Sequence, residues 1–171
     1  RSYRVLDLNE GALGLFGVLL GSGAAEPSGE FNDVIGAGVN LARLTFDPLG
    51  AQPWIANFAE VGRDLLWRLQ REALADPGDD ELSRLLDDLL ALPTIDPDWR
   101  QPDLQRPSDP ALVLHLRGQG LDLRFLTTIT AFQAPQNVAV ENLRIETWFP
   151  FDEATAAACR QLGPKPPPAA D

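Results

Sequence analysis

The stretch 112–149 constrains the fold more than any other part of the chain, because it predicts three consecutive long strands. In the first two strands apolar residues alternate with polar ones, as in a sheet with one buried and one solvated face. The residues predicted for the buried face are Leu112, Leu114, Leu116, Leu121, Leu123, Phe125, Thr127 and Ile129. Between the two strands, Gly118-Gln119-Gly120 supplies the positive φ angles that a tight hairpin needs. The sequence therefore predicts an antiparallel meander with one face reserved for apolar packing.

The third predicted strand covers residues 138–149 and leads into a final helix. A shift in the parity of its apolar residues predicts a β-bulge near Glu141-Asn142. Asp152 follows as the predicted N-cap of the helix. The Pro-rich residues 164–171 predict a disordered tail. Residues 1–163 are therefore expected to form one α+β domain, with the sheet packed against several helices.

Four segments before the predicted sheet carry the apolar spacing of amphipathic helices, and Tyr3–Leu8 alternates like a short first strand. The predicted helices are Ala12–Leu20, Leu41–Phe46, Trp54–Leu74 and Leu82–Leu90. Asn40 has the side chain of a good N-cap for the second helix. In the third helix, Arg68 is predicted to pair with Asp64 and Glu72, each four residues away on the solvent side.

Composition limits what this chain can do by itself. Its 171 residues suffice for one domain with a sizeable core. A net charge of −11 argues against direct nucleic-acid binding, because phosphate contacts need clustered Lys and Arg. Cys159 is the only cysteine, which excludes an internal disulfide or a thiolate metal cluster and makes the reducing cytoplasm the expected compartment. No apolar run approaches the ~20 residues of a membrane span, so no membrane contact is expected.

Enzymatic chemistry has little support in the sequence. His115 is the only histidine, and its place in the alternating pattern puts it on the polar side of a strand. No nucleophile elbow, zinc-protease motif or phosphate-binding loop is present. The acidic residues of 79–88 fall at helix ends and on a solvated face, which is not the pattern of a metal loop. We therefore expect a protein that is not an enzyme and that needs no metal or cofactor.

Aromatic residues from several predicted elements would converge in the interior. They either line an apolar cavity for a small molecule or fill a solid core, and the residues alone leave both readings open. This set consists of Phe46, Trp54, Phe58, Phe125, Phe132 and Trp148.

Two motifs resemble a known family. The first is Asn40-x-x-Arg43-x-x-Phe46, followed by Asn57-Phe58 at a helix start, where the family usually has Asn or Asp before Trp. The second is the whole stretch 125–155. Together they resemble the MmyB-like ligand-binding domain of bacterial regulators of the xenobiotic-response-element (XRE) class, over 3–162. Phe58 keeps an aromatic ring but lacks the indole N–H of the usual Trp.

The resemblance implies a PAS-like fold, a fatty acid or similar amphipathic ligand, and a helix-turn-helix DNA-binding domain before this one. The chain begins at Arg1 and has no Met, so we expect that domain to be missing from this sequence. DNA contact would then occur only through the missing domain. A homodimer is expected from the regulator class, because paired half-sites call for a two-fold protein.

If the ligand is a fatty acid, its carboxylate needs a cation, and Arg43 is the predicted one because a guanidinium binds carboxylates bidentately. Its alternative role is a salt bridge to Asp47 or Glu60. Further polar contacts are predicted from Asn40, Asn57 and Thr127.

The preferred prediction is thus a ligand-sensing domain whose occupancy modulates DNA binding by a transcription regulator. The alternative is a constitutive dimerisation or interaction module with a filled core. An exposed apolar patch on 82–90 would favour that alternative.

Overall fold

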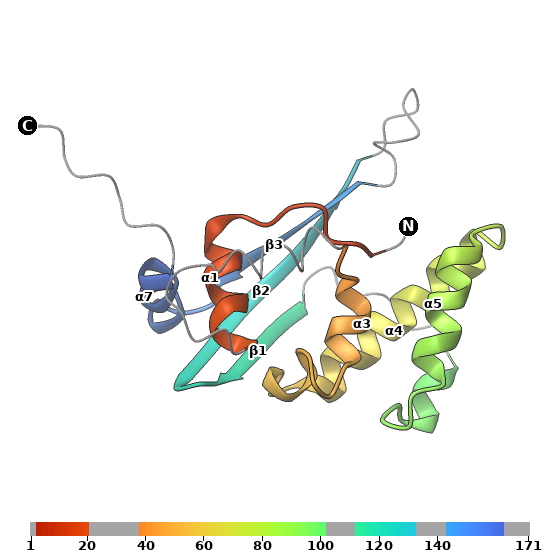
Figure 1. Cartoon of the computed structure of the whole chain (residues 1–171), viewed down its shortest axis with the longest axis horizontal. Coiled ribbons are helices and arrows are strands. Elements are labelled where there is room, and N and C mark those ends of the chain that lie inside the picture. Colours follow the sequence, from red (N-terminus) through yellow and green to blue (C-terminus); the bar gives the residue numbers. More distant parts are fainter. Residues whose placement is uncertain (1–2, 21–37, 102–111, 133–142, 163–171) are drawn as a thin grey trace, which may run out of the picture.

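The computed structural model describes residues 3–20, 38–101, 112–132 and 143–162. A three-stranded antiparallel sheet lies at the centre, with helix α1 across one face and helix α7 at one end (Figure 1). Helices α3, α4 and α5 form a second group beyond the other end of the sheet (Figure 1). The predicted α+β class and C-terminal meander are confirmed.

The sheet follows the alternation in the sequence. Its strands are β1 (Leu112–Gly118), β2 (Leu121–Ala131) and β3 (Arg144–Pro150), in the order β1-β2-β3. The hairpin closes where Gly118 pairs with Leu121, and Gln119 and Gly120 have φ angles of 51° and 80°. Four of the residues predicted for the covered face are buried: Leu114, Leu116, Leu123 and Phe125. The predicted bulge and the tail lie outside the described residues.

One hydrophobic core lies between the sheet, α1 (Glu10–Leu19) and α7 (Glu153–Leu162). Asn9 caps α1 by accepting a hydrogen bond from the Ala12 N–H at 2.8 Å. Asp152 caps α7 by accepting from the Thr155 N–H at 2.8 Å, so the predicted cap is confirmed. The fully buried Thr155 hydroxyl accepts in turn from the Arg124 N–H at 3.0 Å, which fastens α7 to β2.

A second core lies between α3 (Leu41–Phe46), α4 (Phe58–Ala75) and α5 (Asp80–Leu90). The caps agree with the sequence: Asn40 accepts from the Arg43 N–H, and Asp79 accepts from the Leu82 N–H. The leucine face of α5 is buried against this core through Leu82, Leu85 and Leu89. It is therefore not the exposed patch that would have favoured an interaction module.

Two predicted elements differ in the structure. The segment 3–8 forms no strand and makes only an isolated bridge between Arg4 and Asn40. The backbone hydrogen bonds of this segment are formed with residues 39–41 and not with the sheet. For example, the Val5 N–H donates to Val39 O.

The long helix α4 begins at Phe58 and not at Trp54. A short 3₁₀ helix, η1 (Gln52–Trp54), precedes it. Residues 55–57 then run along the free edge of β1, where Ile55 bridges Leu116 and Ala56 N donates to His115 O at 2.7 Å. This pairing requires extended backbone, so the helical turn cannot start earlier.

Candidate ligand-binding site

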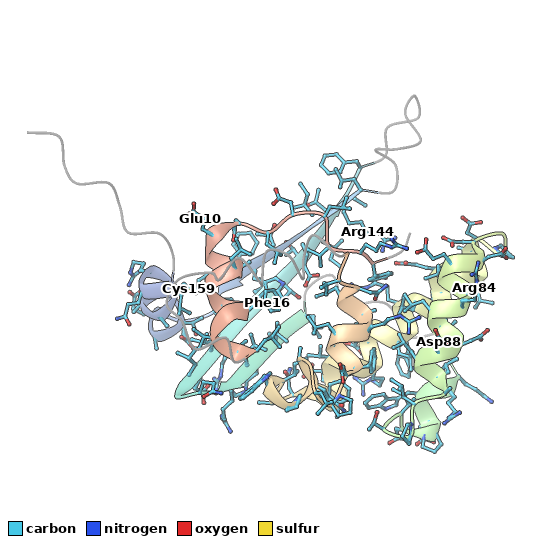
Figure 2. The ribbon with its side chains drawn as sticks, in the orientation of Figure 1. Glu10, Phe16, Arg84, Asp88, Arg144 and Cys159 are labelled. Carbon is cyan, nitrogen blue, oxygen red and sulfur yellow. The ribbon has the colours of Figure 1, made fainter. Side chains whose placement is uncertain are left out.

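A mostly apolar pocket of about 530 Å³ lies in the first core beneath α1. Its walls come from α1, the extended segment 5–9, the start of α3, β3 and the inner side of α7. Phe16 extends from α1 over the strands, and Cys159 lies on α7 at the other side of this space (Figure 2). The lining includes Val5, Leu8, Ala12, Leu15, Phe16, Leu20, Leu41, Leu44, Phe125, Ile145, Trp148, Cys159 and Leu162.

A cluster of three aromatic rings forms one wall of the pocket. Trp148 on β3 stands between Phe16 and Phe125, at centroid distances of 5.8 and 5.6 Å. The Trp148 indole N–H is directed to Glu146, whose Oε1 accepts from it at 2.7 Å. The wall is therefore apolar except for one carboxylate.

A smaller pocket of about 100 Å³ adjoins the first. The two share five lining residues, namely Phe16, Leu20, Leu41, Glu146 and Trp148. Tyr3, Thr45, Trp54, Arg68 and Thr127 complete the polar and aromatic part of its lining. An apolar chain in the larger pocket would thus end near polar groups in the smaller one.

Glu146 and Asp7 are the charged residues that line the larger pocket, and both are acidic. Glu146 is exposed to solvent as a residue, but many protein atoms lie around its carboxyl on the side of the pocket. This partial loss of water around the carboxyl raises the pKa of Glu146, against the opposing effects of the Trp148 N–H and Arg68. A carboxyl in such a place keeps its proton to a higher pH than one in water.

A polar network fastens the N-terminal segment beside the pocket. Arg144 on β3 donates to Glu72 at 2.7 Å, and the Tyr3 hydroxyl donates to the other oxygen of Glu72 at 3.0 Å. Figure 2 shows Arg144 between the sheet and the α4–α5 group. Burial, and next the charge of Glu72, raise the pKa of Tyr3. Burial opposes the charge on Arg144, but Glu72 and Tyr3 outweigh it and raise its pKa.

The ion pairs predicted within α4 are wrong, because both carboxylates have other partners. Glu72 bonds Arg144 and Tyr3, and Asp64 bonds the neighbouring Arg63 at 3.3 Å. Within the described part of the chain neither carboxylate pairs with Arg68. Partners 69 and 72 residues away in sequence, which sequence spacing cannot reveal, take the place of the predicted i, i+4 neighbour.

A family model for the MmyB-like transcription regulator ligand binding domain matches residues 1–162. The chain belongs to this family. The resemblance predicted from the two motifs is thus confirmed over nearly the whole chain. No curated protein matches the chain, and no solved structure matches it.

In this MmyB-like ligand-binding domain, the residues predicted to surround the ligand do not all lie together. Phe125 and Trp148 line the larger pocket, and Trp54 and Thr127 line the smaller one. The structure places the other aromatic residues of the predicted site elsewhere. Phe46 is fully buried in the second core beside Phe58, and Phe132 lies partly exposed at the end of β2.

The three polar residues of the first motif are not among those lining the two pockets. Asn40 caps α3, and Arg43 forms a salt bridge with Asp88 on α5, far from α1 in Figure 2. Asn57 acts as a short extension of the sheet, because its amide donates to Val113 O at 2.7 Å and accepts from His115 N at 3.0 Å. A ligand role for these three stays a prediction without support from their positions.

Sequence reasoning missed Arg68, Glu146 and the apolar face of α1. Arg68 follows the buried-side residue Leu65 by three positions, which is the one local sign that it turns towards the core. Glu146 looks in the sequence like one of several scattered acids. Its position two residues before Trp148 on a predicted strand nevertheless places both on the same face.

Metal and membrane roles gain no support from the described residues. They contain no group of three or more His, Cys, Asp or Glu that could hold a metal ion. His115 Nε2 lies 2.7 Å from Asp122 on the neighbouring strand, which is a structural contact. Among the helices described, none is both long and apolar enough to cross a membrane.

Proposed function

We propose that this domain binds a fatty acid or a similar amphipathic small molecule in the pocket beneath α1. The pocket itself carries the proposal: its volume of about 530 Å³ falls in the usual range for small-molecule sites, and its walls are mostly apolar. The two pockets meet at Glu146, and the smaller one adds Tyr3, Arg68 and Thr127, whereas Asp7 and Asn9 line the larger one. An elongated apolar molecule whose polar end lies at the junction of the two pockets matches this arrangement.

Ligand occupancy would modulate DNA binding by the regulator to which such a domain belongs. The net charge of −11 makes this domain a poor DNA binder by itself. The ligand would therefore act on DNA binding through a change in the conformation of the domain. α1 and the segment 5–9 form walls of the pocket, so they are the elements that a bound molecule contacts and can shift. A ligand changes such an equilibrium only by binding one arrangement more tightly than the other.

The alternative, a constitutive interaction module, has one observation in its favour. Ile145, Phe149 and Phe151 are about half exposed on or just after β3. Ile145 also lines the ligand pocket, and the leucine face of α5 is buried. We therefore prefer ligand binding.

Native mass spectrometry of the purified domain, followed by lipid extraction, tests the proposal. We expect one fatty acid or acyl compound per domain, or uptake of one hexadecanoate after incubation. Ala12→Phe places a ring into the pocket from α1 and should abolish the adduct. Ala59→Phe is the matched control, because Ala59 is an exposed position on α4.

An unliganded mass that persists after incubation with hexadecanoate would refute ligand binding of this kind. The second half of the proposal needs the full-length regulator. Fluorescence anisotropy on its DNA site should then change when hexadecanoate is added, and equal DNA affinity with and without ligand would reject the modulation.

A further inference from the structure

Arg68 is a half-buried cation at the smaller pocket. The carboxylates one turn away on either side are already engaged, Asp64 by Arg63 and Glu72 by Arg144. No ion pair or hydrogen bond of the Arg68 guanidinium occurs within the described part of the chain. Arginines with reduced exposure are normally paired, so this one has unused donors that face a pocket.

Glu146, which belongs to β3, lines the same pocket as Arg68. The charge of Arg68 is close enough to favour the ionised forms of both Glu146 and Tyr3, yet no ion pair joins it to either within the described residues. The Glu146 carboxyl is instead fixed by the Trp148 indole N–H. The space between guanidinium and carboxyl is therefore part of the pocket.

We propose that Arg68 holds the head group of the ligand, and that Glu146 restricts that head group to a single negative charge. Arg68 would bind a carboxylate through its parallel N–H donors, while the apolar chain extends past Trp148 into the larger pocket. Glu146 would share a hydrogen bond with the carboxyl group, because two carboxyls at one site can hold one proton between them. A phosphate dianion beside Glu146 would meet repulsion.

This assignment rests on the proposed function and replaces Arg43 by Arg68 as the head-group residue. Arg43 supplies a matched control, because it is also a helical arginine, but exposed and paired with Asp88. Arg68→Gln and Arg43→Gln remove the same charge and leave side chains of the same kind. Circular dichroism of both variants establishes that they fold.

Three probes with the same chain separate the contributions: hexadecanoate, hexadecan-1-ol and hexadecyl phosphate, each titrated by tryptophan fluorescence. We expect Arg68→Gln to weaken hexadecanoate binding by about ten-fold or more, as for loss of a charge-assisted hydrogen bond. Binding of hexadecan-1-ol should change by less than about two-fold, since no charge-assisted bond is lost. Arg43→Gln should leave both affinities unchanged, and Arg68→Lys should restore part of the preference for the acid.

Glu146→Gln should improve hexadecyl phosphate binding relative to hexadecanoate, because it removes the repulsion and keeps the acceptor for Trp148. Unchanged hexadecanoate affinity in folded Arg68→Gln, or equal losses for the acid and the alcohol, would overturn the assignment of Arg68. An unchanged preference in Glu146→Gln would overturn the role of Glu146. Wild-type protein that binds none of the probes would reject the proposed function as well.

Discussion

Gly14 on α1 gives the sharpest test of how the pocket is closed. A Cβ atom at this position would lie 2.4 Å from the backbone carbonyl oxygen of Leu162 on α7. At Gly11, one turn earlier on the same helix, the nearest atom to such a Cβ would be Asn9 Oδ1 at 3.6 Å, which is an ordinary van der Waals contact. Gly14→Ala and Gly11→Ala thus add the same methyl group to one helix, once against backbone and once without obstruction.

The expected magnitudes follow from two opposing effects. Alanine in place of glycine inside a helix stabilises it by about 0.5–1 kcal/mol, and both variants receive this gain. At Gly14 the new methyl is about 1 Å too close to the carbonyl oxygen, and backbone cannot rotate away as a side chain can. Separating α1 from α7 is overpacking, which costs about 1–3 kcal/mol. Gly11→Ala should therefore be the more stable variant by about 1–3 kcal/mol.

Urea unfolding followed by tryptophan fluorescence measures both free energies, by linear extrapolation. The comparison between the variants removes the helix-propensity gain and isolates the contact between α1 and α7. Free energies of unfolding that agree within about 0.5 kcal/mol would show that the two helices lie farther apart than the Gly14–Leu162 approach requires. In that case the pocket would not have a fixed wall at α7.

Three further substitutions probe the core and the pocket. Phe125→Ala should lower the free energy of unfolding by about 3–5 kcal/mol in urea, because the ring is buried against Trp148. Thr155→Val should cost about 1–3 kcal/mol, since the buried Arg124 N–H loses its acceptor; an unchanged midpoint would place water there. Glu146→Gln should have a higher free energy of unfolding than wild type at pH 7, and this difference should vanish at pH 4. The raised pKa of Glu146 means that wild type loses stability as pH rises from about 4.5 through the folded-state pKa, so a gain that is independent of pH would contradict burial of this carboxyl as the cause.

The elements that the sequence predicted well are those fixed by local chemistry. The β1–β2 hairpin needs only alternation and the positive φ angles at residues 119 and 120. Helix α5 begins at the residue after Asp79 because that side chain caps it, and its leucine spacing determines which face is buried. In each case the deciding residues lie within a few positions of one another.

The errors arose where a distant partner decides. Residues 55–57 would continue a helix by local propensity, but the free edge of β1 offers them hydrogen bonds at His115 and Leu116. The segment 3–8 has the alternation of a strand but bonds residues 39–41. Periodicity describes which side of an element is apolar, and it does not say which neighbour supplies the backbone partners.

The predicted site residues lie apart in the structure for the same reason, since every arginine on a helix looks alike in sequence. Arg43 is satisfied by Asp88, 45 residues away, which removes the need for a ligand there. Sequence spacing assigns Arg68 two carboxylates that the structure gives to Arg63 and Arg144. The residue left with unused donors can be found only after all pairings are known.

The same pairings explain how the walls of the pocket beneath α1 are held apart. An apolar cavity tends to collapse unless its walls are held by contacts elsewhere. In this domain the Asn9 cap fixes the start of α1, the Thr155–Arg124 bond fixes α7, and the Tyr3–Glu72–Arg144 network fixes the segment before α1. The Thr155–Arg124 bond and the Glu72–Arg144 pair involve no residue that lines either pocket, so a ligand can fill the space without breaking them. Its binding free energy would then add to the stability of this arrangement, as for any molecule that binds only the folded state. Under the proposed function, occupancy of the pocket would thereby stabilise this position of α1.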